Sequence, residues 1–153
     1  MNRQIRYGAS LLLIAGIALA GCGGSHSNDN VSNVGHTAPI GSWGGTLTSD
    51  ATPATLTLTN SGGHFDFSCG QTADITQPVQ PDSTGHFSVP GTATLGYVPN
   101  RPAQKAQFTG TVTNHVMTVS LLVTPTTGSA FTIGPYTVTF GQAAPVFQGA
   151  CPG

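Results

Sequence analysis

Through most of the chain, apolar and polar residues alternate in short runs, and turn-forming residues interrupt these runs roughly every 8 to 12 positions. A period of two places apolar side chains on one face of a strand and polar side chains on the other. Leucine alternates with threonine over 55–59, and the next run places Phe65, Phe67 and Cys69 on one face. Because a turn-forming Asn-Ser-Gly-Gly sequence at 60–63 joins the two runs, they predict a β-hairpin.

The clearest pair of alternating runs surrounds a turn at Asn114-His115. Both runs carry an apolar residue at every second position, and the two apolar sets fall on the same face of the resulting hairpin. A shift by one residue would expose every apolar side chain, so we expect a firmly set register. The inward positions are Ala106, Phe108, Gly110 and Val112 before the turn, and Met117, Val119, Leu121 and Val123 after it.

Further strands are expected on both sides of this hairpin. An Asx-type turn at 82–85 precedes one of them, and a last pair of strands is predicted over 131–140. The alternation slips by one residue at Gly134-Pro135, which indicates a bulge or an edge position. The apolar positions are Phe87, Val89, Ala93, Leu95 and Tyr97 in the first segment, and Phe131, Ile133, Tyr136, Val138 and Phe140 in the second.

No segment after residue 22 combines helical period with helical length, so every connection between strands is expected to be short and antiparallel. Sequential hairpins without crossover helices predict an all-β fold, namely a single small antiparallel meander barrel of about eight strands. A β-sandwich is the alternative. The barrel is preferred because its closure removes exposed strand edges.

The first residues have the three parts of an export signal. Arg3 and Arg6 precede an apolar run over 11–20, which is too short to span a bilayer, and Leu-Ala-Gly-Cys follows at 19–22. This ending resembles the lipobox of bacterial lipoproteins. The resemblance implies that Cys22 is lipidated and becomes the acylated N-terminus, so that the protein is anchored to the membrane. Gly23 follows the cysteine, and in such proteins its presence in place of Asp implies the outer membrane where the host has one.

The chain is therefore expected to have three parts. Residues 1–21 form a lipoprotein signal peptide, and 22–38 form a polar, glycine-rich tether that includes His26 and His36. Residues 39–153 form the β-barrel-like domain. Localisation in the cell envelope follows from the lipid anchor.

Charge excludes one class of partner. Once residues 1–21 are removed, Arg101 and Lys105 are the only Lys or Arg side chains, against five acidic side chains, all of them Asp. Nucleic-acid binding needs clustered Lys and Arg, so we expect no nucleic-acid partner. Abundant Thr, Gly and Ser also agree with exposed strand faces rather than helices.

Two cysteines remain once Cys22 is assigned to lipid, namely Cys69 and Cys151. An exported location favours a disulfide between them, which would stabilise the fold by roughly 4 to 5 kcal/mol on the chain-entropy account. The alternative is two buried free thiols, each packed as a small apolar side chain.

Gly41-Ser42-Trp43 at the start of the first expected strand resembles the Gly-x-Trp opening of the lipocalin and avidin superfamily. The resemblance implies a barrel whose tryptophan closes one end. The match covers three residues, the chain has no C-terminal helix pattern and no second tryptophan, and a ligand therefore does not carry over. The preferred interpretation of Trp43 is an ordinary core aromatic rather than a family marker.

Candidate chemistry is sparse. No nucleophile elbow, zinc-protease pair or phosphate-binding loop is present, and Asp66 and Asp74 fall at outward, solvated positions. His64, His86 and His115 each lie beside a turn, and three turns at one barrel end would let them share a transition metal. A polar residue also simply suits an outward position, and we predict no catalytic residue, no metal, no cofactor and no enzyme activity.

Three classes of function remain. The preferred one is a lipid-anchored envelope lipoprotein whose non-catalytic β domain contacts another envelope protein or a surface polymer. The alternatives are a barrel that holds a small apolar ligand, and a hydrolase or metal enzyme. A filled interior would favour the first class, and an open apolar interior would favour the second.

Overall fold

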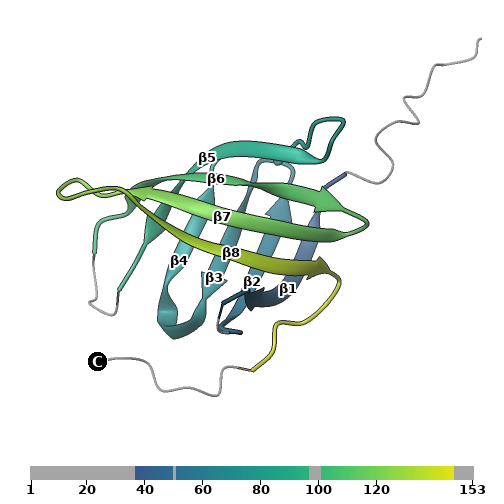
Figure 1. The fold of residues 1–153 in the computed structure, drawn as a ribbon, viewed down its shortest axis with the longest axis horizontal. Helices are drawn as coiled ribbons and strands as arrows, with labels where there is room; N and C mark the ends of the chain where they lie inside the picture. Colours follow the sequence, from purple (N-terminus) through teal and green to yellow (C-terminus); the bar gives the residue numbers. More distant parts are fainter. Residues whose placement is uncertain (1–36, 50, 97–100, 147–153) are drawn as a thin grey trace, which may run out of the picture.

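The protein folds as a closed, eight-stranded antiparallel barrel in a computed structural model that describes residues 37–49, 51–96 and 101–146 (Figure 1). Each strand pairs with the next along the chain, and β8 pairs with β1 to close the sheet. The all-β meander barrel is confirmed, and the sandwich alternative is wrong. The strands are β1 (Gly41–Leu47), β2 (Pro53–Thr59), β3 (Gly62–Phe67), β4 (Thr72–Ile75), β5 (His86–Thr94), β6 (Gln104–Thr113), β7 (Val116–Thr124) and β8 (Phe131–Phe140), with a 3-10 turn η2 (Ser68–Gly70) after β3.

The predicted β6–β7 hairpin is confirmed in position and register. Phe108 lies opposite Leu121, and Val112 lies opposite Met117. Asn114 and His115 form the turn with φ values of 49° and 65°. Two successive residues with positive φ are typical of the tight turns whose twist matches that of paired strands. The β2–β3 hairpin, which turns at 60–61, is confirmed as well.

The last predicted pair of strands is a single strand, β8. Val119 lies opposite Tyr136 and Leu121 opposite Ile133, so one residue of β7 faces two residues of β8 at Gly134-Pro135. This is the predicted bulge. The bulge explains the one-residue shift in the alternation, because the extra residue in β8 returns the side chains after it to the inward face without a turn.

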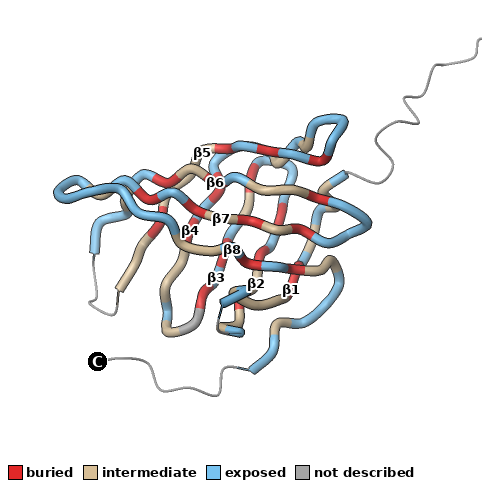
Figure 2. The backbone as a smooth tube through the Cα atoms, in the orientation of Figure 1, coloured by how far each residue is buried: buried red, intermediate tan, exposed pale blue. Residues whose placement is uncertain are grey.

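The barrel interior is filled by apolar side chains. Buried and exposed residues alternate along the strands, as expected for one inward and one outward face (Figure 2). Phe65 packs edge-on against Phe67 and Tyr136, with ring centroids 4.6 and 5.2 Å apart. The largest fully buried side chains are Trp43, Phe65, Phe108, Leu56, Met117, Leu121, Val112, Val119, Val123 and Val138.

Two inward glycines make room for large rings. A Cβ atom on Gly91 would lie 2.5 Å from the Phe108 ring, and one on Gly110 would lie 2.9 Å from the Phe87 ring. Real Cβ atoms do not approach other atoms so closely. Large aromatic side chains beside glycines therefore fill the narrow barrel to the density of an ordinary protein core.

Trp43 lies near the barrel end at which β1 begins, here called the N-terminal end. Its side chain is fully buried, its indole N–H donates to the Pro39 carbonyl oxygen at 3.1 Å, and its ring meets Phe140 edge-on at 5.4 Å. Ala38 packs against the same core. Trp43 and its neighbours thus help to close this end.

The segment after β8 folds back over the outside of the barrel. Gly141 N–H donates to the Ser42 carbonyl oxygen at 2.9 Å, and Gly44 then lies directly beneath the backbone of Ala143 and Ala144. Val146 borders the same surface groove as Phe67, at the end of β3. We call residues 141–146 the C-terminal strap, and it leads toward the part of the barrel that carries η2.

The alternation predicts that Cys69 shares a face with Phe65 and Phe67. The structure shows that this prediction is wrong. The strand ends at Phe67, and Cys69 lies in η2 with a φ of 69° and a half-buried side chain. Cys151 lies outside the described residues, so the disulfide stays a prediction.

The predictions for the signal peptide, for Cys22, for the tether histidines and for Tyr97 also fall outside the described residues. Among the residues that the structure does describe, no helix is long and apolar enough to cross a membrane.

Candidate functional site

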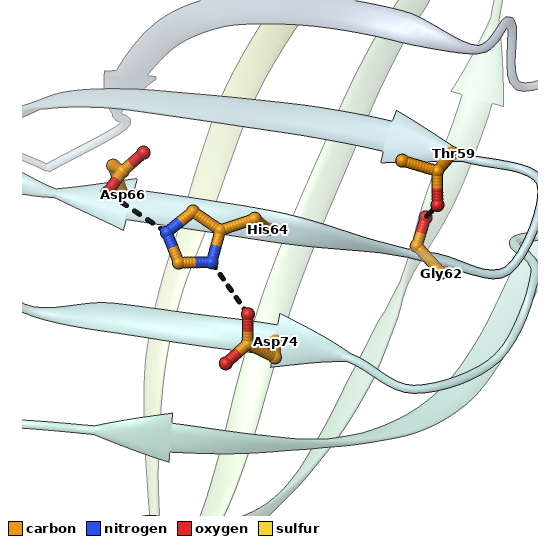
Figure 3. A network of polar contacts seen from close by, with 5 residues as sticks. All are labelled: Thr59, Gly62, His64, Asp66 and Asp74. Carbon is orange, nitrogen blue, oxygen red and sulfur yellow. Dashed lines mark hydrogen bonds and ion pairs between the residues drawn. The ribbon is translucent and has the colours of Figure 1, made fainter.

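The outward face of β3 and β4 carries a cluster of ionisable side chains, the Asp-His-Asp cluster, which consists of His64, Asp66 and Asp74 (Figure 3). His64 and Asp66 are two residues apart on β3 and therefore point to the same face. Asp74 lies directly opposite His64 on β4. The strand period and the β3–β4 register together place all three side chains on the outside of the barrel.

The imidazole of His64 lies between the two carboxylates. Its Nδ1 is 2.6 Å from Asp74 Oδ1, and its Nε2 is 3.3 Å from Asp66 Oδ1. An ionised carboxylate can only accept a hydrogen bond, so each ring nitrogen needs its own proton to bond both partners at once. The shorter contact fixes the Nδ1 proton toward Asp74.

These side chains are accessible to solvent, with 48% of the His64 side chain, 57% of Asp66 and 58% of Asp74 exposed. The pKa of His64 is raised, mainly by the hydrogen bond to Asp74, while partial burial acts in the opposite direction and the charges of Asp66 and Asp74 add to the increase. The cluster is therefore a place on the surface that favours a bound positive charge.

The cluster lacks the nucleophile of a hydrolytic triad. In the described ranges, the hydrogen bonds of the His64 ring go to two carboxylates, and none goes to a Ser or Thr hydroxyl. Thr57 is the β2 residue opposite His64, and it is exposed. The arrangement can hold a proton or a cation, but it does not activate a hydroxyl group.

The three histidines singled out from the sequence are not brought together. Their turns do lie at the same N-terminal end of the barrel, but His64, His86 and His115 are all exposed on different strands or turns. His115 packs beside Phe140, with ring centroids 5.9 Å apart. Outward side chains diverge around a barrel, and no group of three or more His, Cys, Asp or Glu side chains in the described part has metal-binding geometry.

Sequence reasoning missed the contact between His64 and the two aspartates, which were interpreted as separately solvated. A signal for it was present. A His-x-Asp pair on one predicted strand, followed by an Asp on the next, places three ionisable groups on one face when the hairpin register pairs the histidine with the second Asp. That register depends on η2, whose conformation was not predicted.

Other hollows bordered by described residues also lie on the outside. One, over β5 to β7, is lined by hydroxyl groups and His86; another borders Lys105 and Thr124 between the β5–β6 and β7–β8 connections. Neither contains a cluster of ionisable side chains. The Asp-His-Asp cluster is the strongest candidate for chemistry.

Comparison with known proteins gives no relative: no family model, no curated protein and no solved structure matches the chain.

Proposed function

We propose that this protein is a lipid-anchored component of a bacterial cell envelope whose barrel acts by contact, through its outer surface, with another envelope protein or a surface polymer. The lipobox-like ending at Cys22 supports the anchor. The packing of the barrel supports contact through the outer surface.

The observation that carries the proposal is the filled interior. Ten large apolar side chains in the core are less than 2% exposed, and within the described ranges no charged side chain is buried. The polar groups on the largest buried aromatic side chains are the Trp43 N–H, which is bonded to Pro39, and the Tyr136 hydroxyl. A small-molecule site generally needs a cavity with a few polar groups inside it. Groups able to recognise a partner lie instead on the outer face, where threonine rows surround the Asp-His-Asp cluster.

Closure of the barrel also limits how a partner can bind. The β1–β8 pairing leaves no free strand edge, so a partner cannot add a strand to the sheet without opening it. Contact must therefore use side chains and loops. A disulfide between Cys69 and Cys151, if formed on export, would hold the C-terminal strap against the barrel and suit a domain exposed outside the cytoplasm.

Photo-crosslinking in the host tests this proposal. A photoreactive residue at outward positions of the full-length protein, Thr57 or Thr92, should give discrete adducts of constant mass. The same proteins carrying Cys22→Ser should lose both the membrane fraction and the adducts.

An absence of adducts from all outward positions would contradict the proposal. So would saturable binding of a fluorescent fatty-acid analogue to the purified protein, because the interior would then have to open to hold it.

A further inference from the structure

We propose that one edge of the N-terminal end docks onto the surface of the lipid bilayer that carries the anchor. This edge, the uncharged rim, consists of residues 37–42, 113–118 and 139–143. The inference rests on the proposed lipidation of Cys22 and adds an orientation to it. The uncharged rim faces the lipid, and the Asp-His-Asp cluster lies on the other side of the barrel.

Two backbone hydrogen bonds bring the three segments of the uncharged rim together. Phe140 N–H donates to the His115 carbonyl oxygen at 2.9 Å, and Gly141 N–H donates to the Ser42 carbonyl oxygen at 2.9 Å. The β6–β7 turn, the end of β8 and the start of β1 therefore form one continuous edge (Figure 1). Paired strands lie about 4.8 Å apart, so β7 and β1 are separated by roughly 10 Å across β8.

The uncharged rim exposes apolar side chains. Ile40 is 56% exposed and Val116 is 38% exposed, and both belong to the few large apolar side chains that are exposed among the described residues. The ring of Phe140 is only partly buried and reaches toward Gly41, where an added Cβ atom would lie 3.1 Å from it. A single exposed apolar residue is ordinary, but several along one edge indicate a contact surface.

The distribution of charge favours lipid as the occupant. The uncharged rim contains no Asp, Glu, Lys or Arg. Asp66 and Asp74 lie on β3 and β4, across the barrel from β7 and β8, and Lys105 lies near the other end of the barrel, at the start of β6. This edge can therefore approach the bilayer without removing a charged group from water, which would oppose docking.

The connection to the anchor also selects the bilayer. The uncharged rim begins at Thr37, 15 residues after Cys22. A chain spans at most about 3.3–3.6 Å per residue, so Thr37 stays within roughly 55 Å of the lipidated residue whatever the conformation between them. Docking of a tethered domain is an intramolecular event, and a weak apolar contact is then sufficient. A protein partner that diffuses freely lacks this advantage.

Paramagnetic relaxation measured by NMR tests the docking. The protein, purified from its host with its acyl chains, is placed in phosphatidylcholine nanodiscs that contain a lipid with a gadolinium chelate on its headgroup. Relaxation of the amides at 114–116 should be enhanced more strongly than at Lys105. Val116→Asp should lower the enhancement at 114–116 by at least about twofold, because membrane affinity scales with the apolar area buried. Val116→Thr, which keeps the branched shape, should lower it less.

Leu122→Asp is the matched control. Leu122 is an outward residue of the same strand and is 44% exposed, but it lies toward the other end of β7. This variant should leave the enhancement at 114–116 unchanged, and raising the salt concentration should also leave it unchanged, because no charged pair is involved. Amide spectra in detergent verify that each variant keeps the fold.

Three results with an acylated protein would overturn the docking while leaving the anchor in place. These are no loss of enhancement in either Val116 variant, an equal loss in Leu122→Asp, and a loss when the salt concentration is raised. The mass of the same sample reports the acyl chains separately. A protein without acyl chains at Cys22 would contradict the anchor and the docking together.

Discussion

At the scale of single residues, one carboxylate oxygen organises the β4–β5 loop. Asp82 Oδ1 accepts hydrogen bonds from Thr84 N–H at 2.8 Å, from the Thr84 hydroxyl at 2.7 Å and from His86 N–H at 3.0 Å. The hydrogen bonds from Thr84, followed by the bond from His86, lower the pKa of Asp82 from its ordinary value of 3.8. This is the Asx turn predicted from the sequence, and it aligns the start of β5.

The Asp82→Asn substitution tests whether the negative charge of Asp82 stabilises this turn. A lowered pKa in the folded state means that the ionised carboxylate stabilises the fold above pH 3.8 and that this contribution is lost as the pH falls through the lower folded value. Wild type should therefore be more stable than Asp82→Asn at neutral pH, and the difference should shrink at a pH below 3.8. Urea unfolding at both pH values measures it, and a difference independent of pH would contradict the assignment.

The Gly110→Ala substitution tests how tightly the interior is packed. Gly110→Ala places a methyl group against the Phe87 ring and the backbone of Thr118, and neither can retreat within a closed sheet. We expect a loss of about 1–3 kcal/mol in the free energy of unfolding. Thr109→Ala, one residue away on the outward face, should change it by less than about 0.5 kcal/mol. Equal effects of the two substitutions would mean that the interior is loosely packed.

At the scale of elements, alternation predicted most of the strands because a period of two is visible in the sequence wherever one face is buried. It was less informative where a local backbone feature interrupts the period. The alternation predicts Cys69 on a strand face because it does not reveal that β3 ends at Phe67 or that Cys69 has a positive φ. The bulge was recognised at Gly134-Pro135, but its two sides were read as separate strands.

The contact within the candidate site was the least predictable. Closure of the barrel was predicted, but the His64–Asp74 contact across the β3–β4 hairpin was not. This contact depends on the register across a connection whose geometry the sequence pattern does not specify. The fold class was therefore predictable, whereas the candidate site was visible only as three separate polar residues.

The C-terminal strap gives a prediction at this scale. Gly44→Ala puts a methyl group where the backbone of Ala143 and Ala144 passes, so the strap must lift from β1 while the barrel stays closed. Amide hydrogen exchange should become faster at Gly141, whose N–H is bonded to Ser42, with little change in β6 and β7. Ser42→Ala is the control, since its exposed side chain can be lost without displacing the strap. Unchanged exchange in Gly44→Ala would show that the strap is not held there.

At the scale of the whole molecule, the described residues form a closed sheet around a filled core, and the proposed function therefore places recognition on the outer surface and the loops. The N-terminal end, to which the tether would connect at Thr37 and Ala38, is partly closed by Trp43 and Phe140. A lipid anchor at Cys22 would therefore present the outer strand faces, including the Asp-His-Asp cluster, to neighbouring components of the envelope.

Native mass spectrometry of the full protein, extracted in mild detergent from its host, tests this account most directly. We predict a polypeptide that begins at Cys22, carries acyl chains, lacks the two thiol hydrogens of Cys69 and Cys151, and holds no apolar small molecule. A polypeptide that retains residues 1–21 or lacks acyl chains would contradict the anchor. A stoichiometric apolar ligand would contradict a barrel that works from its outer surface.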